Sequence, residues 1–320
     1  NLSLGSEVRN ALIDRMVAVT QSAGVLIVAA AGNSRQNGNP PEYPASIPHV
    51  LTVGSLDSTG QPSFFSSGSP HVDLSAPGER IWVAVPTSFH PPDNYDQFDG
   101  TSFASPMVAA AADWVWSVRP ELDASQVFDI MRASAQDTWT PGFDPFTGFG
   151  RLDIPAALAT TPPPRDPQEP NEDVSYIKPG GILHRAAAPL TFAGHKSGSI
   201  SARLDRGDDP RDVYRFWVPG GKAASVALQP VDGDVDLALW GPKTRSVLET
   251  GRARKQDSRG LSDRSGTKRD RLRVRNTSGR GAYFYAEATY AAGNANSSRH
   301  PAGNRYVLSV SVVSSKPARH

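Results

Sequence analysis

The first half of the chain alternates between apolar residues at helical spacing and short apolar runs. The spacing predicts helices over residues 7–22, 102–117 and 124–132. In the first of these helices the apolar positions are Val8, Leu12, Met16 and Val19. Residues 25–31 are apolar without alternation, which is typical of a strand covered on both faces of a parallel sheet. Further strands are expected at 49–55 and 72–78, so this half favours an α/β fold.

The second half shows no helical spacing and instead alternates every second residue. Tyr214, Phe216 and Val218 share one face of a strand, and Val235, Leu237 and Leu239 share one face of another. Strands are predicted at 199–204, 213–218, 225–228, 235–240, 272–274, 283–290 and 306–313. Seven short strands separated by Gly, Asp and Pro turns predict an all-β sandwich.

Composition narrows the classes of protein to which the chain can belong. The 320 residues suffice for two domains, and 38% hydrophobic residues suit a globular protein. The absence of Cys excludes a disulfide scaffold, a thiolate metal site and a cysteine nucleophile. The longest apolar run, Val25–Ala31, is far shorter than the ~20 residues of a membrane span. Because the chain does not open with Met, the lack of a signal peptide carries no information.

The net charge of +1 conceals two oppositely charged halves. Residues 1–160 hold 7 Lys or Arg and 16 Asp or Glu, whereas residues 161–320 hold 26 and 16. A Pro-rich stretch marks the boundary between them. We therefore predict an α/β domain over 1–159, a linker over 160–168 and a β-sandwich domain over 169–320.

Candidate chemistry lies in the heptapeptide from Gly100 to Pro106, Gly-Thr-Ser-Phe-Ala-Ser-Pro. A serine at a loop-to-helix junction has an exposed hydroxyl, and the first N–H groups of the helix lack partners. The partial positive charge of the helix N-terminus favours an anion forming beside it. A plain N-cap serine on an Ala-rich core helix is the ordinary alternative.

This heptapeptide resembles the nucleophile motif of the subtilisin-like serine peptidases. Four more segments resemble family motifs, in the family's order: Ser3-Leu4-Gly5, the Ala29–Asn33 strand end, the Tyr43–Gly54 stretch, and Ser75-Ala76-Pro77-Gly78. The closing Gly148–Asp153 segment also fits, so the resemblance covers nearly all of residues 1–159. It implies a subtilisin-like parallel sheet flanked by helices, of which this chain carries the C-terminal part.

The resemblance also implies roles for individual residues. Ser102 would be the nucleophile, and the Asn33 side chain with the Ser102 backbone N–H would hold the oxyanion. Substrate-binding residues would be Ser3, Leu4, Gly5, Ala30, Ala31 and Gly32. The first three would pair with an extended protein or peptide substrate. The small side chains of the others suggest an open apolar pocket that does not select for charge.

The general base and its orienting acid are missing from the matching motifs. In the family they come from an Asp and a His segment upstream of the substrate strand, and no His of this chain is followed by Gly. His49, His71 and His90 are expected to be solvated surface residues, and Asp73 and Asp99 surface or turn carboxylates.

Three explanations stay open: a longer protease, a nicked enzyme whose N-terminal piece remains bound, or a pseudo-enzyme. We expect a secreted serine endopeptidase whose partner is an N-terminal fragment or chain carrying Asp and His, and we expect this chain alone to be inactive. A catalytically inert scaffold or binding protein is the alternative.

The second half resembles the bacterial pre-peptidase C-terminal domain through Glu169–Asp173, Asp212–Phe216 and Gly233–Leu239. Some relatives bind calcium with such an acidic segment, because carboxylate and amide oxygens suit a hard cation. Candidate calcium ligands are Glu169, Asn171, Asp208 and Asp212. A solvated acidic loop is the alternative.

Residues 252–280 hold 11 Lys or Arg and three acidic residues. No aromatic residue accompanies them, so the stretch gives no support for nucleic-acid binding by base stacking. It predicts either a solvated loop leading to a charged edge strand or docking to an anionic surface. That surface could be an acidic cell-wall polymer, an acidic protein, or the acidic first half of this chain.

Overall fold

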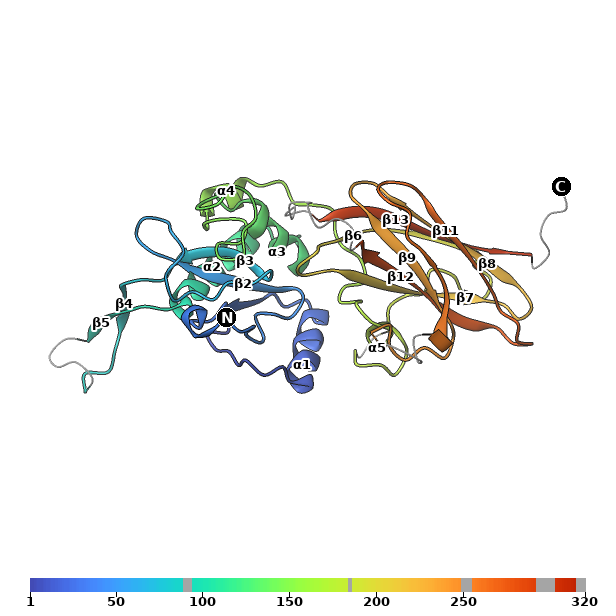
Figure 1. The fold of residues 1–320 in the computed structure, drawn as a ribbon, viewed down its shortest axis with the longest axis horizontal. Helices are drawn as coiled ribbons and strands as arrows, with labels where there is room; N and C mark the ends of the chain where they lie inside the picture. Colours follow the sequence, from blue (N-terminus) through green and yellow to red (C-terminus); the bar gives the residue numbers. More distant parts are fainter. Residues whose placement is uncertain (89–93, 184–185, 249–254, 292–302, 315–320) are drawn as a thin grey trace. The chain divides into compact units, whose positions relative to one another are not determined.

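The apolar runs of the first half form a parallel sheet. The computed structural model describes residues 1–88, 94–183, 186–248, 255–291 and 303–314. Its three-stranded sheet has the order β1–β2–β3, from Ile27–Ala30, Val50–Leu56 and Val72–Pro77. Leu2 adds a parallel bridge to Ala29 at the β1 edge. The parallel sheet with its helices is the predicted α/β arrangement (Figure 1).

Helices cover this sheet on two faces, because its strands are apolar on both sides. Helix α2 (Thr101–Val118) packs Ala104, Val108 and Val115 against one face in a core that includes Leu51 and Leu74. Helices α3 (Ala124–Ala133) and α4 (Ile154–Ala159) complete that layer. On the other face, α1 (Ala11–Ser22) contributes Val17 to a core with Ile27, Ala29 and Val50.

Helix α1 differs from its prediction in extent and in its buried face. It begins at Ala11, because the Asn10 side chain accepts from the Leu12 N–H at 2.8 Å and caps the helix. The predicted apolar positions are exposed, at 72% for Val8, 65% for Leu12, 54% for Met16 and 37% for Val19. The sheet is instead contacted through Val17, so the described residues leave an apolar stripe of α1 open to solvent.

A short hairpin precedes α2, made of β4 (Ile81–Ala84) and β5 (Tyr95–Phe98). A 3₁₀ turn, η1 (Arg35–Asn37), follows the end of β1. In the residues that the structure describes, no helix is long and apolar enough to cross a membrane.

The described chain divides into two units between Arg165 and Asp166, inside the Pro-rich stretch. From Asp166 onward, after the one-turn helix α5 (Val174–Ile177), the strands form two antiparallel sheets ordered β10–β9–β12–β7 and β11–β8–β13–β6. We call this the two-sheet unit. Its strands are β6 (Ser197–Leu204), β7 (Arg211–Val218), β8 (Ala223–Pro230), β9 (Val235–Trp240), β10 (Ser258–Ser262), β11 (Asp270–Arg275), β12 (Ala282–Tyr290) and β13 (Asn304–Val313).

Both sheets contribute to one hydrophobic core. Tyr214, Phe216 and Val218 are buried there together with Leu237 and Leu239, on the faces that the alternation predicts. All seven predicted strand segments lie within strands of the structure. The prediction missed β10, whose sequence Ser-Arg-Gly-Leu-Ser has one apolar residue and no alternation to detect.

The basic segment supplies one edge strand to each sheet. On β11, Leu272 and Val274 face the core, whereas Arg271, Arg273 and Arg275 are exposed. This pattern fits an edge strand that charge protects from pairing with other chains. Residues 252–254 of the segment lie outside the described residues.

A buried ion pair links β3 to α3 and corrects one prediction. Asp73 was expected to be a surface or turn carboxylate, but its side chain is fully buried. Its Oδ1 lies 3.5 Å from Arg132 Nε, and its Oδ2 accepts from the Thr52 N–H at 2.8 Å. The Arg132 guanidinium also lies 4.8–5.0 Å from the ring centres of Phe128 and Phe149. Asp99, by contrast, is exposed in a turn, as predicted, where it accepts from the Arg80 N–H.

Replacing Arg132 by Met should strongly destabilise the first unit, because it leaves the buried Asp73 carboxylate without its cation. We expect a loss of about 3–5 kcal/mol in the free energy of unfolding. Urea denaturation of the 320-residue chain measures it. Arg9→Met is the matched control, since the Arg9–Asp14 pair is exposed at the arginine and should contribute less than ~1 kcal/mol. Equal losses in the two variants would contradict the assignment.

Candidate active site

Ser102 is the second residue of α2, at the carboxyl edge of the parallel sheet. The Gly100 N–H donates a 2.8 Å hydrogen bond to the carbonyl of Gly78. Because Gly78 directly follows β3, this bond holds the start of α2 at the carboxyl edge of the sheet. Because Ser102 lies in the first turn, its backbone N–H precedes the first intrahelical bonds and is available to a ligand. Within the described residues the Ser102 side chain makes no hydrogen bond.

Asn33 follows β1 at the same edge and is anchored to the first turn of α2. Its Oδ1 accepts from the Thr101 N–H at 3.0 Å and from Thr101 Oγ1 at 2.9 Å. These bonds fix which end of the amide faces the helix, so Nδ2 is left as the outward donor. A Cβ built on Gly100 would lie 3.4 Å from that Nδ2. The Asn33 amide donor therefore lies beside the turn that carries Ser102.

Pro106 explains a contact between the N-terminal strand and the helix. As the sixth residue of α2 it lies beyond the first turn, so its missing N–H would have bonded to the Ser102 carbonyl. Ser3 Oγ donates to that carbonyl instead, at 2.8 Å. Ser105 Oγ likewise donates to Asn1 Oδ1 at 2.6 Å. The predicted substrate residue Ser3 is thus joined directly to the candidate nucleophile.

The other predicted substrate-binding residues line the two strand ends next to this turn. Leu4 is exposed, while Ala30 and Ala31 are buried, so these two alanines offer little surface to a ligand. Gly5 and Gly32 both border Glu42, a residue that the sequence interpretation did not select. No motif pointed to Glu42, since it precedes the Tyr-Pro of a matched segment and is not part of it.

The described histidines of the first unit lie at the opposite edge of the sheet from Ser102. His49 and His71 directly precede β2 and β3, so they lie at the amino ends of parallel strands, whereas Asn33 and Ser102 lie at the carboxyl edge. A seven-residue strand such as β2 spans roughly 20 Å. Both side chains are half-buried and not fully solvated. His90 lies outside the described residues.

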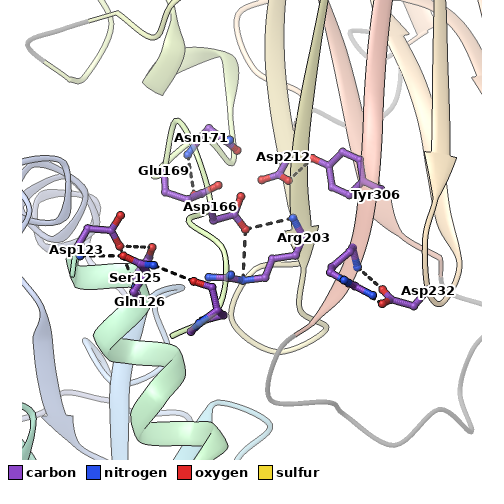
Figure 2. Close-up of polar contacts among 12 residues, drawn as sticks. Asp123, Ser125, Gln126, Asp166, Glu169, Asn171, Arg203, Asp212, Asp232 and Tyr306 are labelled. Carbon is purple, nitrogen blue, oxygen red and sulfur yellow. Dashed lines mark hydrogen bonds and ion pairs between the residues drawn. The ribbon is translucent and has the colours of Figure 1, made fainter. Parts of the chain in front are cut away.

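In the two-sheet unit, carboxylates gather near the start of β7 (Figure 2). Asp166, Glu169 and Asp212 each offer an oxygen, and these oxygens all lie within 4.8 Å of one another. Two of the four predicted calcium ligands, Glu169 and Asp212, are therefore brought together, and Asp166 is an addition. Asn171 lies next to them but uses its Oδ1 to accept from the Val213 N–H at 3.3 Å. Asp208 is not part of this group.

Neighbouring side chains already contact these carboxylates. Arg203 Nε lies 3.6 Å from Asp166 Oδ2, and the Arg203 N–H donates to the same oxygen. Tyr306 donates its hydroxyl to Asp212 (Figure 2). Tyr306 also shares a 2.9 Å hydrogen bond with Tyr214. Burial, followed by the nearby Asp212 charge, raises the pKa of both tyrosines well above the ordinary value. The tyrosines therefore remain donors at neutral pH.

A second carboxylate group surrounds Asp236 on β9. Burial raises the pKa of Asp236 to about 6, and the negative charges of Asp234, Asp270 and Asp263 add to the shift. Asp270 is fully buried and accepts from Ser262 Oγ and from the Arg264 N–H. Nothing in the sequence separated this group from ordinary turn residues, because its members come from three strand ends.

Comparison with known proteins gives a family match for the first unit. Residues 1–150 match the subtilase family. The matched region contains both residues and Ser3, but not the two-sheet unit.

Individual proteins are similar to part of the chain. The chain is 32% identical over 216 residues to the halolysin-like extracellular serine protease Nep of Natrialba magadii, covering 68% of this chain and 37% of Nep. It is 35% identical over 159 residues to subtilisin DY of Bacillus licheniformis, covering 49% and 55%. Among solved structures, the prenylagaramide maturation protease PagA matches with 29% identity and a TM-score of 0.43, over 50% of this chain and 60% of PagA. The chain thus spans between about one third and about one half of the length of these curated relatives.

The pKa of Asp236 predicts a pH-dependent gain from Asp236→Asn. The Asp236 carboxyl binds its proton more tightly in the folded chain than in the unfolded chain. The contribution of this proton to the free energy of unfolding is therefore complete below the ordinary pKa of 3.8 and is lost as pH rises through about 6. Asn, which stays neutral, should therefore stabilise the two-sheet unit at pH 8 and have no effect near pH 4. Urea denaturation at both pH values tests this. Asp232→Asn is the control, because Asp232 forms an exposed ion pair with Arg305 and its replacement should bring no such gain at pH 8. An equal gain at both pH values would contradict the prediction.

Proposed function

We propose that this chain is part of a secreted subtilisin-like serine endopeptidase. The single observation that carries the proposal is the pairing of Asn33 with the first turn of α2, which leaves Asn33 Nδ2 and the Ser102 N–H as two donors beside the Ser102 hydroxyl. The subtilase match over residues 1–150 supports it. Similarity to an extracellular protease supports secretion.

In the proposed reaction, Ser102 Oγ attacks the carbonyl carbon of a peptide bond while a base takes its proton. The carbonyl oxygen becomes an oxyanion, which the Asn33 amide and the Ser102 N–H bind by hydrogen bonds. The amine leaves with a proton from the same base, and water then releases the acyl group by the reverse sequence. Ser3, Leu4 and Gly5 would pair with the substrate backbone.

We further propose that the base and its orienting acid, a His and an Asp, belong to a polypeptide segment outside these 320 residues. The position of His49 and His71 at the far edge of the sheet supports this. The exposed apolar stripe of α1 would offer such a segment a surface to cover. By this account, these 320 residues alone hydrolyse no peptide, although Ser102 and Asn33 are already arranged.

Covalent labelling tests the proposed function. In the complete protease, a fluorophosphonate should label Ser102, and Ser102→Ala should abolish both labelling and hydrolysis. Asn33→Leu should lower kcat about 10²- to 10³-fold, a magnitude known from subtilisin itself. Ser117→Ala, an exposed serine of the same helix, is the control that should change nothing. A wild-type protein that is neither labelled nor active would favour the inert scaffold or binding protein instead.

We propose that the two-sheet unit is an accessory β-sandwich domain of the pre-peptidase C-terminal type. We also propose that Asp166, Glu169 and Asp212 of this unit bind calcium. Three carboxylate oxygens within 4.8 Å form the hard-oxygen set that Ca²⁺ prefers. The Arg203 guanidinium beside Asp166 would limit the affinity, because it already offsets one negative charge. Bound calcium would hold the segment around Glu169 to the start of β7.

Calorimetric titration of the metal-free 320-residue chain with CaCl₂ tests this site. We expect one Ca²⁺ to bind at millimolar concentration or below and to stabilise the unit by about 2.7 kcal/mol at 100 times the Kd. Glu169→Gln and Asp212→Asn should each abolish the heat of binding. Asp232→Asn, a carboxylate of the same unit paired with Arg305, should retain it. Absence of binding by the wild-type chain would disprove the proposal.

A further inference from the structure

The Glu42 carboxylate lies between the two strand ends that flank Ser102. A Cβ built on Gly5 would come within 2.8 Å of Glu42 Oε2, and one built on Gly32 within 2.5 Å of Glu42 Cγ. Gly32 also has a φ of +101°, which disfavours any side chain there. Both glycines thus leave room for one side chain, and the half-buried Glu42 occupies it.

The backbone on either side holds Glu42 in this place. Ser6 and Tyr43 form an antiparallel bridge with hydrogen bonds of 3.0 and 2.9 Å in the two directions. The Ser46 N–H donates to the Glu42 carbonyl at 2.8 Å. Because the backbone of Glu42 and of Tyr43 is anchored, the Glu42 side chain is directed into the gap between Gly5 and Gly32.

Within the described residues, no cation neutralises this carboxylate. Its Oε1 accepts from Ser34 Oγ at 3.1 Å, and its Oε2 makes no hydrogen bond. Two arginines near this segment make other contacts: Arg35 lies 3.9 Å from the centre of the Phe146 ring, and Arg9, which lies 5.8 Å from the centre of the Tyr43 ring, pairs with Asp14. A negative charge with an open oxygen therefore borders the candidate site.

We propose that Glu42 determines specificity, selecting Lys or Arg as the substrate residue whose carbonyl Ser102 attacks. This inference rests on the proposed function. Gly32 directly precedes Asn33, and Gly5 is two residues from Ser3, which bonds to Ser102. A residue whose carbonyl contacts Asn33 and Ser102 must place its side chain within about one residue length of them, towards Gly5, Gly32 and Glu42. An ammonium or guanidinium there would meet Glu42 Oε2 in a charge-assisted hydrogen bond.

The proposal replaces the sequence-based expectation of an apolar pocket without charge selection. That expectation considered only Ala30, Ala31 and Gly32, two of which are buried and expose little surface to a substrate. An apolar substrate side chain against Glu42 Oε2 would bury the carboxylate without a partner, which is costly. The same carboxylate would also repel an acidic substrate residue.

Peptide hydrolysis by the complete protease tests the proposal. The substrates differ only in the residue before the scissile bond: Arg, Lys, norleucine or Glu. We expect kcat/KM for Arg and Lys to exceed that for norleucine about 10- to 100-fold. Glu42→Gln, which keeps the size and the Ser34 contact, should remove most of this preference, by lowering kcat/KM for Arg and Lys and by raising kcat/KM for norleucine, because no carboxylate is then buried without a partner. Glu121→Gln, an exposed carboxylate in the loop between α2 and α3, should keep the preference. A wild-type preference for norleucine, or an unchanged preference in Glu42→Gln, would overturn the assignment.

A binding measurement separates this proposal from the proposed function. Benzamidine, a small mimic of the arginine side chain, is titrated into the 320-residue chain without any other segment and followed by calorimetry. Binding to the wild type, with a loss of about tenfold or more in Glu42→Gln, would support the pocket even if Ser102 proved unreactive. Absence of benzamidine binding to the wild type, in a protease that labels at Ser102, would overturn the Glu42 assignment alone.

Discussion

The missing N–H of Pro106 is the constraint on which the candidate site depends. It leaves the Ser102 carbonyl without an intrahelical donor, and the Ser3 hydroxyl takes that place. On its other side, the same turn of the helix is held by the Asn33 amide through Thr101. The segment around Ser3 and the end of β1 are thereby joined to one helical turn. The parallel sheet makes this possible, because the carboxyl ends of its strands meet at one edge.

The two units differ in how they handle buried charge. In the first unit, Asp73 is buried with Arg132, so a negative and a positive group compensate each other. In the two-sheet unit, burial of Asp236, together with the charges of neighbouring carboxylates, raises the pKa of its carboxyl to about 6. Near Asp212, buried tyrosines and Arg203 supply donors. The carboxylate group around Asp236 therefore changes its charge as the pH passes through about 6.

The sequence predicted those features that repeat or that follow one another along the chain. The strands of both units follow from runs and alternation, and the closeness of Asn33 to the turn that carries Ser102 follows from local motifs. Three features could not be predicted, because they depend on residues far apart in sequence. The orientation of α1 depends on Val17 reaching the sheet, the burial of Asp73 on the approach of α3, and the place of Glu42 on two glycines at positions 5 and 32. The edge strand β10 escaped prediction because pairing with β9, and not its own polar sequence, stabilises it.

The two glycines that border Glu42 have a consequence for how this chain can vary in evolution. A side chain at position 32 would collide with Glu42 Cγ, and one at position 5 would push the Glu42 carboxylate out of the gap. A shorter residue at position 42 would free space for a side chain at position 5. Substitutions at positions 5, 32 and 42 should therefore be correlated among descendants of a common ancestor. We expect Glu42 to be replaced before Gly5 is.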